Sequence, residues 1–93
     1  GEWDLEVTPG DVEVEHGSRL VVTARFNGAV PADAQLVSAI GETVRRSPMT
    51  RNLADPVFVA SIPEVTTDGS YRIVFADQES REFNIATFVL PAV

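Results

Sequence analysis

Apolar and polar residues alternate along most of this chain, with the period of two that is typical of β-strands. Residues 2–7 alternate acidic with apolar residues, and the alternation resumes over residues 11–15 after an interruption at Thr8-Pro9-Gly10. Pro9 has no backbone N–H to donate, so it suits the edge of a sheet. We therefore expect an edge strand that is broken into two halves.

The next segment has the pattern of a central strand. Residues 19–26 are rich in β-branched residues and place Leu20, Val22, Ala24 and Phe26 on one face. Asn27-Gly28 follows, a pair that tolerates the positive φ of a turn. Further strands are expected over residues 34–40, 43–49, 57–62, 71–75 and 81–89, with Pro63 closing the strand before it and polar turns at residues 67–70 and 77–80.

Residues 34–40 leave two interpretations open. Leu36, Val37 and Ile40 would share one side of a helix together with Val44, but Gly41 and the β-branched neighbours favour a strand. Residues 43–49 contain Arg45, Arg46 and Pro48, which suits a solvent-facing edge strand protected by positive charge.

Seven or eight short strands with regular turns predict an all-β sandwich of two antiparallel sheets with Greek-key connections. The 93 residues suit a single domain over residues 1–93, with a core from about residue 3 to residue 90. Because Gly1 stands where an initiator methionine would be, we expect a domain cut from a larger protein.

Charge and composition exclude several classes of partner. The net charge of −7 argues against binding to nucleic acid or to an anionic membrane surface, since both require a positive field. No apolar run approaches the roughly 20 residues that span a bilayer, so we expect no membrane insertion by this fragment. The chain has no cysteine, which excludes disulfides, a thiol nucleophile and thiolate metal ligands.

Two segments resemble immunoglobulin-like domains. The segment Gly17-Ser18-Arg19-Leu20-Val21-Val22-Thr23-Ala24 resembles their second strand, with Ala24 where an antibody-type domain has its first core cysteine. Gly69-Ser70-Tyr71-Arg72-Ile73 resembles the sixth strand, with Tyr71 as the tyrosine of a tyrosine corner and Ile73 at the second cysteine position.

The resemblance implies a disulfide-free immunoglobulin-like or fibronectin type III-like sandwich of a bacterial surface or envelope protein. In such a domain Tyr71 buries its ring and ties a neighbouring loop to the sheet through its hydroxyl, so Tyr71, Ile73 and Ala24 have structural roles. The chain departs from antibody domains because Trp3 is its only tryptophan and the third strand has none.

The inventory of reactive residues predicts no enzyme. His16, the only histidine, falls in an expected turn, so a serine triad has no plausible base and zinc lacks a ligand set. Gly-rich phosphate loops are also absent from the sequence. We therefore assign no catalytic, cofactor-binding or metal-binding residue and expect no cofactor.

Calcium is the metal for which ligands are abundant. Loop carboxylates and backbone carbonyls could together form an oxygen site. Acids that alternate along a strand point outward in a row, however, and are better explained as a solvated face. The candidate acids are Asp4, Glu6, Asp11, Glu13, Glu15, Asp68, Asp77 and Glu79.

Recognition of a glycan would require exposed aromatic rings, and most of the rings are expected to face inward. The inward set is Trp3, Phe26, Phe58, Tyr71, Phe75 and Phe83, whereas Phe88 is out of phase with Phe83 and could be exposed or mark a bulge. Arg45, Arg46 and Arg51 form the only basic cluster, which could dock a protein or simply prevent aggregation.

Three functions remain open. The first is a monomeric, non-catalytic structural or spacer module of a larger exported or membrane-anchored bacterial protein, placed outside the cell or in the periplasm and contacting neighbouring domains. The second is a module that binds protein or glycan through its loops or a sheet edge. The third is a junction between domains that calcium stabilises.

Overall fold

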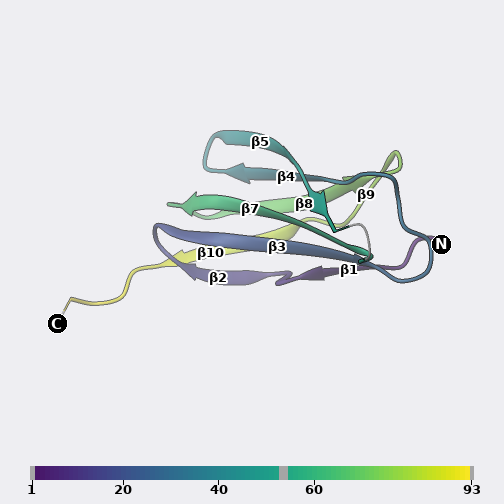
Figure 1. Ribbon diagram of the computed structural model, residues 1–93. Coiled ribbons are helices and arrows are strands. Elements are labelled where there is room, and N and C mark those ends of the chain that lie inside the picture. The colour runs from purple at the N-terminus through teal and green to yellow at the C-terminus, as the bar shows by residue number, and fades with distance from the viewer. Residues whose placement is uncertain (1, 53–54, 93) are drawn as a thin grey trace.

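The computed structural model describes residues 2–52 and 55–92, and the described residues form ten strands and no helix (Figure 1). The strands are β1 (Leu5–Thr8), β2 (Val12–Glu15), β3 (Ser18–Phe26), β4 (Gln35–Ile40), β5 (Thr43–Pro48), β6 (Thr50–Arg51), β7 (Val57–Val65), β8 (Gly69–Phe75), β9 (Gln78–Glu79) and β10 (Phe83–Phe88). The sequence pattern missed only the two-residue strands β6 and β9, which are too short to show a period of two.

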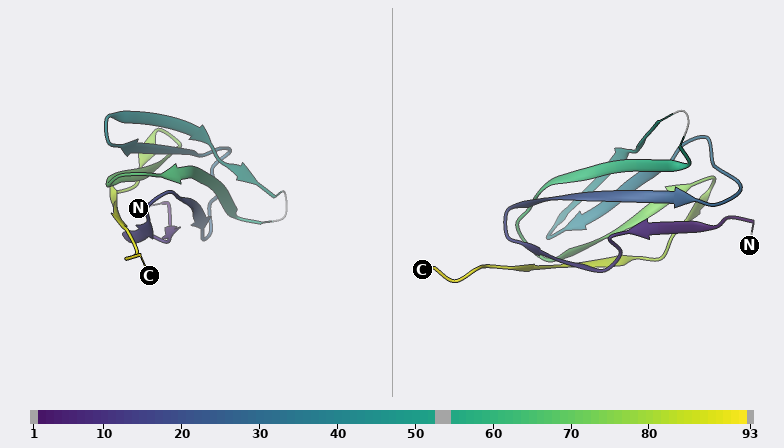
Figure 2. Two further views of the ribbon diagram at one scale, coloured as in Figure 1. Left: turned by 90° about the vertical axis from the view of Figure 1, so that its left-hand side faces the viewer. Right: turned by 60° about the horizontal axis from the view of Figure 1, so that its bottom comes forward.

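The strands form two sheets, which confirms the predicted all-β sandwich. One sheet has the order β1-β3-β7-β6, and the other has the order β2-β10-β8-β4-β5, with β9 beside β8. Successive strands such as β3 and β4, or β7 and β8, lie in different sheets, so the chain crosses repeatedly from one layer to the other (Figure 2). These crossings give the Greek-key arrangement.

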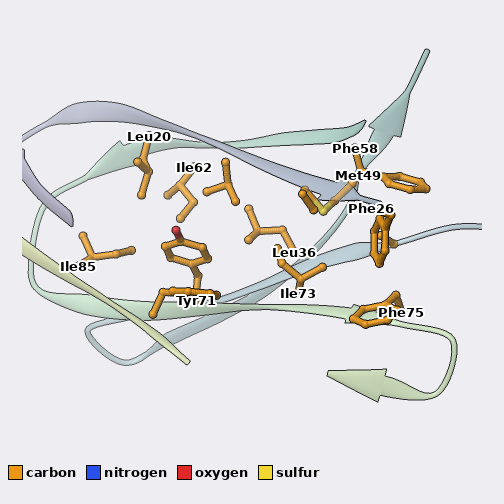
Figure 3. Packing of buried hydrophobic residues seen from close by; sticks show 14 of the residues in the cluster. Leu20, Phe26, Leu36, Met49, Phe58, Ile62, Tyr71, Ile73, Phe75 and Ile85 are labelled. Carbon is orange, nitrogen blue, oxygen red and sulfur yellow. The ribbon is translucent and has the colours of Figure 1, made fainter. Parts of the chain in front are cut away.

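The inner faces of the two sheets meet in one apolar core (Figure 3). The predicted inward face of β3 is buried along its whole length, because no residue from Leu20 to Phe26 on that face is more than 5% exposed. Phe26 lies at one end of the core and packs edge-to-face against three other aromatic rings. The rings are those of Trp3, Phe58 and Phe75, with centroid distances of 6.1, 5.7 and 5.0 Å.

The two halves of the N-terminal strand belong to different sheets. Strand β1 pairs antiparallel with β3, whereas β2 pairs parallel with β10. The interruption at Thr8-Pro9-Gly10 is therefore where the chain moves from one sheet to the other. The other described strand pairs are antiparallel, as predicted, and this one pair is parallel because crossing between the layers without reversing direction brings β2 alongside β10.

Residues 35–40 form a strand, as the sequence favoured, and the helical interpretation was wrong. Strand β4 lies between β5 and β8 and pairs antiparallel with both. Leu36 faces the core cluster, and Val37 is also buried although it faces the opposite side of the sheet. This two-sided burial explains why apolar residues follow one another without alternation here.

Pro63 does not close its strand, contrary to the prediction. Strand β7 continues to Val65, and its register against β3 shifts between the pairs Ser18↔Val65 and Leu20↔Ile62. The shift places two residues, Pro63 and Glu64, opposite the single residue Arg19, which is the arrangement of a β-bulge. A bulge tolerates proline because no ladder hydrogen bond from that N–H is required.

The last hairpin also differs from its prediction. The turn lies at Ala76 and Asp77, which have φ of 46° and 58°, and Gln78–Glu79 already pairs with β8. Strand β10 begins at Phe83 rather than at residue 81, because Ser80 interrupts the ladder. Its hydroxyl accepts a hydrogen bond of 2.9 Å from the Ile73 N–H, and its own N–H donates to the Ile73 carbonyl at 2.8 Å.

The chain leaves the body of the sandwich after β10. Phe88 is 42% exposed, Val89 77% and Leu90 61%, and the segment that follows β10 extends away from the sheets at the end opposite the N-terminus (Figure 1). The residues that pack in the core run from Trp3 to Ile85, so the packed region ends before residue 90.

Candidate functional site

Tyr71 lies in the middle of the core, on β8. Its side chain is 1% exposed, and its hydroxyl donates a hydrogen bond of 2.8 Å to the carbonyl of Gly10. Gly10 belongs to the link between β1 and β2, where the chain changes sheets. Burial raises the pKa of the Tyr71 hydroxyl above its usual value, so it remains a neutral donor at physiological pH. This bond ties the β1–β2 link, where the chain changes sheets, to strand β8.

The residues around this bond form a connected group, which we call the kink cluster: Gly10, Asp11, Tyr71, Arg81 and Phe83. Gly10 is buried and has a φ of 78°, a conformation in which other residues are strained. The Tyr71 ring stacks on Phe83 at 5.2 Å, and the Arg81 guanidinium lies 4.1 Å from the centroid of Phe83. The cluster joins the β1–β2 link to β8 and β10.

Asp11 completes the kink cluster. Its carboxylate accepts a hydrogen bond of 2.9 Å from the Asn84 backbone N–H and forms an ion pair of 3.2 Å with Arg81. The hydrogen bond from the Asn84 N–H is the main cause that lowers the pKa of the Asp11 carboxyl below its usual value, and the hydrogen bond from Arg81 is the second. Asp11 therefore occupies the free edge of β10 just before β2 begins to pair with it.

Ala24 and Ile73, the residues at the two cysteine-like positions, are both completely buried. Ala24 lies on β3 and Ile73 on β8, so they come from the two different sheets and belong to the same core cluster. Neither side chain carries a polar group. Their contribution is the filling of the space between the sheets.

Several carboxylates that the sequence offered as calcium ligands are bound to protein donors instead. Asp68 accepts hydrogen bonds from the backbone N–H and hydroxyl of Thr87, at 2.8 and 3.0 Å. Glu79 forms an ion pair of 3.0 Å with Arg72. Within residues 2–52 and 55–92, no three or more His, Asp or Glu side chains gather as metal ligands would.

Two of these carboxylates give the fold a pH dependence. The backbone N–H of Thr87, and then its hydroxyl, lower the pKa of the Asp68 carboxyl, as Asn84 and Arg81 do for Asp11. A folded pKa below that of the unfolded chain, about 3.9, means that the stabilisation is fully present above this value. It is lost as the pH falls through the lower folded pKa.

We therefore expect the double variant Asp11→Asn, Asp68→Asn to flatten the acid limb of the stability curve. Thermal unfolding followed from about pH 5 to pH 2 should show a smaller decline in Tm than the unmodified chain shows. The matched control is Asp33→Asn, at an exposed position in the loop before β4. An unchanged acid limb in the double variant would contradict this assignment.

His16 lies on the surface, whereas most of the aromatic rings lie in the core. His16 is exposed, and its backbone N–H donates to the Phe88 carbonyl at 2.8 Å. The five predicted inward rings of Phe26, Phe58, Tyr71, Phe75 and Phe83 are buried, and Trp3 is partly buried against the same core. The sequence left open whether Phe88 is exposed or marks a bulge, and the structure shows that its ring is exposed.

The basic cluster is divided among different surfaces. Arg45 and Arg46 are adjacent on β5, so they face opposite sides of the sheet, and Arg51 lies on β6 in the other sheet. Arg46 donates to the Gln35 side chain at 3.0 Å, and Arg51 donates to the Asp55 carbonyl at 2.9 Å. The three residues do not form one docking patch.

Arg45 lines a cleft of about 320 Å³ between the end of β7 and the β4–β5 edge. Its other polar groups are hydroxyls and the Glu64 carboxylate, and its apolar floor includes Ile40 and Ile62. The volume is at the lower limit for small-molecule sites.

Comparison with known proteins supports the fold and nothing finer. No protein-family model matches the chain, and no curated protein matches it. Among 48 structurally similar chains, an engineered protein aligns with a TM-score of 0.71 and 13% identity, over 94% of this chain and 20% of that one. This chain therefore spans one fifth of the engineered chain.

A second similar structure concerns T cell specificity and activation by the bacterial superantigen toxic shock syndrome toxin-1. One of its chains aligns with a TM-score of 0.57 and 10% identity, over 92% of this chain and 99% of that chain. At these identities the likeness establishes the all-β, two-sheet fold alone. Among the described residues, no helix is long and apolar enough to cross a membrane.

Proposed function

We propose that this chain is an immunoglobulin-like, non-catalytic spacer module of a larger exported or membrane-anchored bacterial protein, working outside the cell or in the periplasm. The motifs around Ala24 and around Tyr71 support the immunoglobulin-like assignment. The two-sheet sandwich, with Ala24 and Ile73 fully buried on different sheets, supports it further. The partners of such a module are the neighbouring domains of its parent chain.

One observation carries the spacer role. Asp11, Asp68 and Tyr71 each form a hydrogen bond with the backbone of another strand or link. These polar groups hold segments of the sandwich together, which is the requirement of a rigid spacer.

The whole parent protein provides the direct test. The spacer role predicts an export signal or membrane-spanning segment, or further domains of similar fold, in the same polypeptide. Fractionation of the source cells should place the parent in the envelope or outside the cell. A parent that is a cytosolic enzyme would overturn the proposal.

Addition of calcium separates the spacer from a calcium-stabilised junction. A ligand that binds the folded state alone raises Tm by mass action. Because Asp11 and Asp68 are already bonded to protein donors, we expect the Tm of the isolated chain to be the same with EDTA and with about 5 mM calcium. Magnesium at the same concentration is the ionic-strength control. A rise in Tm that is specific to calcium would favour the junction.

A further inference from the structure

The sandwich has an open side where two sheet edges do not cover each other. Strand β1 forms one edge, β9 and the start of β10 form the other, and the groove between them has a volume of about 520 Å³. We call it the β1–β9 groove. Its apolar lining consists of Trp3, Leu5, Val7, Phe75 and Phe83, and its polar rim includes Glu6, Gln78 and Arg81.

The groove has the features of a site for an extended apolar segment. The side of β1 away from β3 pairs with no described strand, so its backbone groups are free to bind an added strand. The Trp3 indole N–H is shielded from solvent and has no hydrogen-bond acceptor among the described residues. A donor left without an acceptor is costly, and a backbone carbonyl brought in beside Trp3 would relieve that cost.

The chain itself carries a segment with the matching chemistry. Phe88, Val89 and Leu90 are consecutive apolar residues that are 42%, 77% and 61% exposed. We call residues 88–92 the tail: Phe88 ends β10, where its backbone still pairs with β2, and the four residues after it span roughly 13 Å at about 3.3 Å per residue. The tail leaves one end of the sandwich, whereas the strands that border the groove, β1 and β9, lie toward the other end, near the N-terminus (Figure 1).

Because these two surfaces lie at opposite ends, the tail cannot fill the groove of its own domain. We propose that the β1–β9 groove binds the Phe88–Ala92 tail of a second copy of this chain, which joins successive copies end to end. The contact is heterologous, since a tail on one copy meets a groove on the next. The inference rests on the proposed spacer role, for which it specifies how neighbouring modules meet.

The contact is expected to be weak between free molecules. A single short strand buries less surface than the roughly 1,200 Å² at which stable interfaces begin, so free copies dissociate readily. Modules linked in one polypeptide experience an effective concentration of about 1 mM, which makes such a contact persistent. Free copies should therefore be monomeric at about 10 µM and associate toward 1 mM.

Sedimentation velocity over this concentration range tests the proposal with two variants. One lacks the apolar side chains of the tail, and the other has a blocked groove. Phe88→Ser with Leu90→Ser removes the apolar tail and preserves the groove, and Leu5→Arg blocks the groove and preserves the tail. Each variant alone should stay monomeric near 1 mM, whereas an equal mixture should form a dimer of about twice the mass. The matched control Val21→Ser with Val44→Ser removes two exposed valines elsewhere and should associate like the unmodified chain.

A peptide titration keeps the test decisive if Leu5→Arg fails to fold. The probe is a capped peptide of residues 87–92, added to the Phe88→Ser, Leu90→Ser chain, whose groove is free. Trp3 is the only tryptophan, so its fluorescence should shift saturably to shorter wavelength as the peptide covers it. A peptide carrying the same two serines should produce no shift.

Two results would overturn the proposal: association that persists in the Phe88→Ser, Leu90→Ser chain, or an unmodified chain that stays monomeric near 1 mM with Trp3 fluorescence unaffected by the peptide. Either result would leave the spacer role intact. The spacer role fails separately, if the parent protein proves to be a cytosolic enzyme.

Discussion

Replacement of Phe26 by alanine is expected to lower the free energy of unfolding by about 3–5 kcal/mol, the range for removal of a buried aromatic ring. Phe26 is 1% exposed and packs edge-to-face against Trp3, Phe58 and Phe75. The substitution therefore leaves a cavity and removes three aromatic contacts. Since a domain of this kind is stable by about 5–15 kcal/mol, the loss is a large part of the total.

Urea denaturation followed by Trp3 fluorescence measures this change. The control is Phe88→Ala, which removes a phenyl ring from a position that is 42% exposed. It should change the free energy of unfolding by no more than about 0.5 kcal/mol. Equal effects at the two positions would show that the ring cluster around Phe26 does not contribute the expected packing energy.

Substitution of Tyr71 by phenylalanine is expected to cost about 1–3 kcal/mol, although it removes a single oxygen atom. The change leaves the Gly10 carbonyl buried without its donor, and water cannot readily replace the hydroxyl at a position 1% exposed. For a domain of this size, each kcal/mol corresponds to roughly 4–8 °C in Tm.

Thermal unfolding by circular dichroism measures this effect, with Thr66→Val as the control because it removes a hydroxyl from an exposed position. The loss of the Tyr71 hydroxyl should also loosen the link between β1 and β2, which hydrogen exchange at β2 would detect. A Tm that is unchanged by Tyr71→Phe would mean that the Gly10 bond contributes nothing to stability.

The long strands could be predicted from residue patterns because each has one dry face. Strand β3 illustrates this, since every second residue from Leu20 to Phe26 is buried. The burial of Tyr71 was predictable from its inward phase, but its hydroxyl bonds to Gly10 and not to the backbone a few residues upstream, as it would in a tyrosine corner. Strand β4 was ambiguous because Val37 is buried on the face away from the core, which hides the alternation.

The parts that sequence reasoning missed depend on contacts between distant residues. Asp11 was considered as a calcium ligand, and only the approach of Arg81 and Asn84 assigns it to the kink cluster. The bulge at Pro63 is similar, because a proline ends an isolated strand pattern but is accepted where the opposite strand is one residue short. In neither case do neighbouring residues in the sequence carry the information.

The fold class, the two-layer core and the absence of cysteine chemistry could all be predicted from the sequence, because alternation and composition act locally and additively. The sheet that each half of the N-terminal strand joins, and the partner of the Tyr71 hydroxyl, depend on tertiary packing. The same packing places an aromatic groove and an exposed apolar tail at opposite ends. Such relations depend on how two sheets pack in space, and a pattern with a period of two residues does not encode that packing.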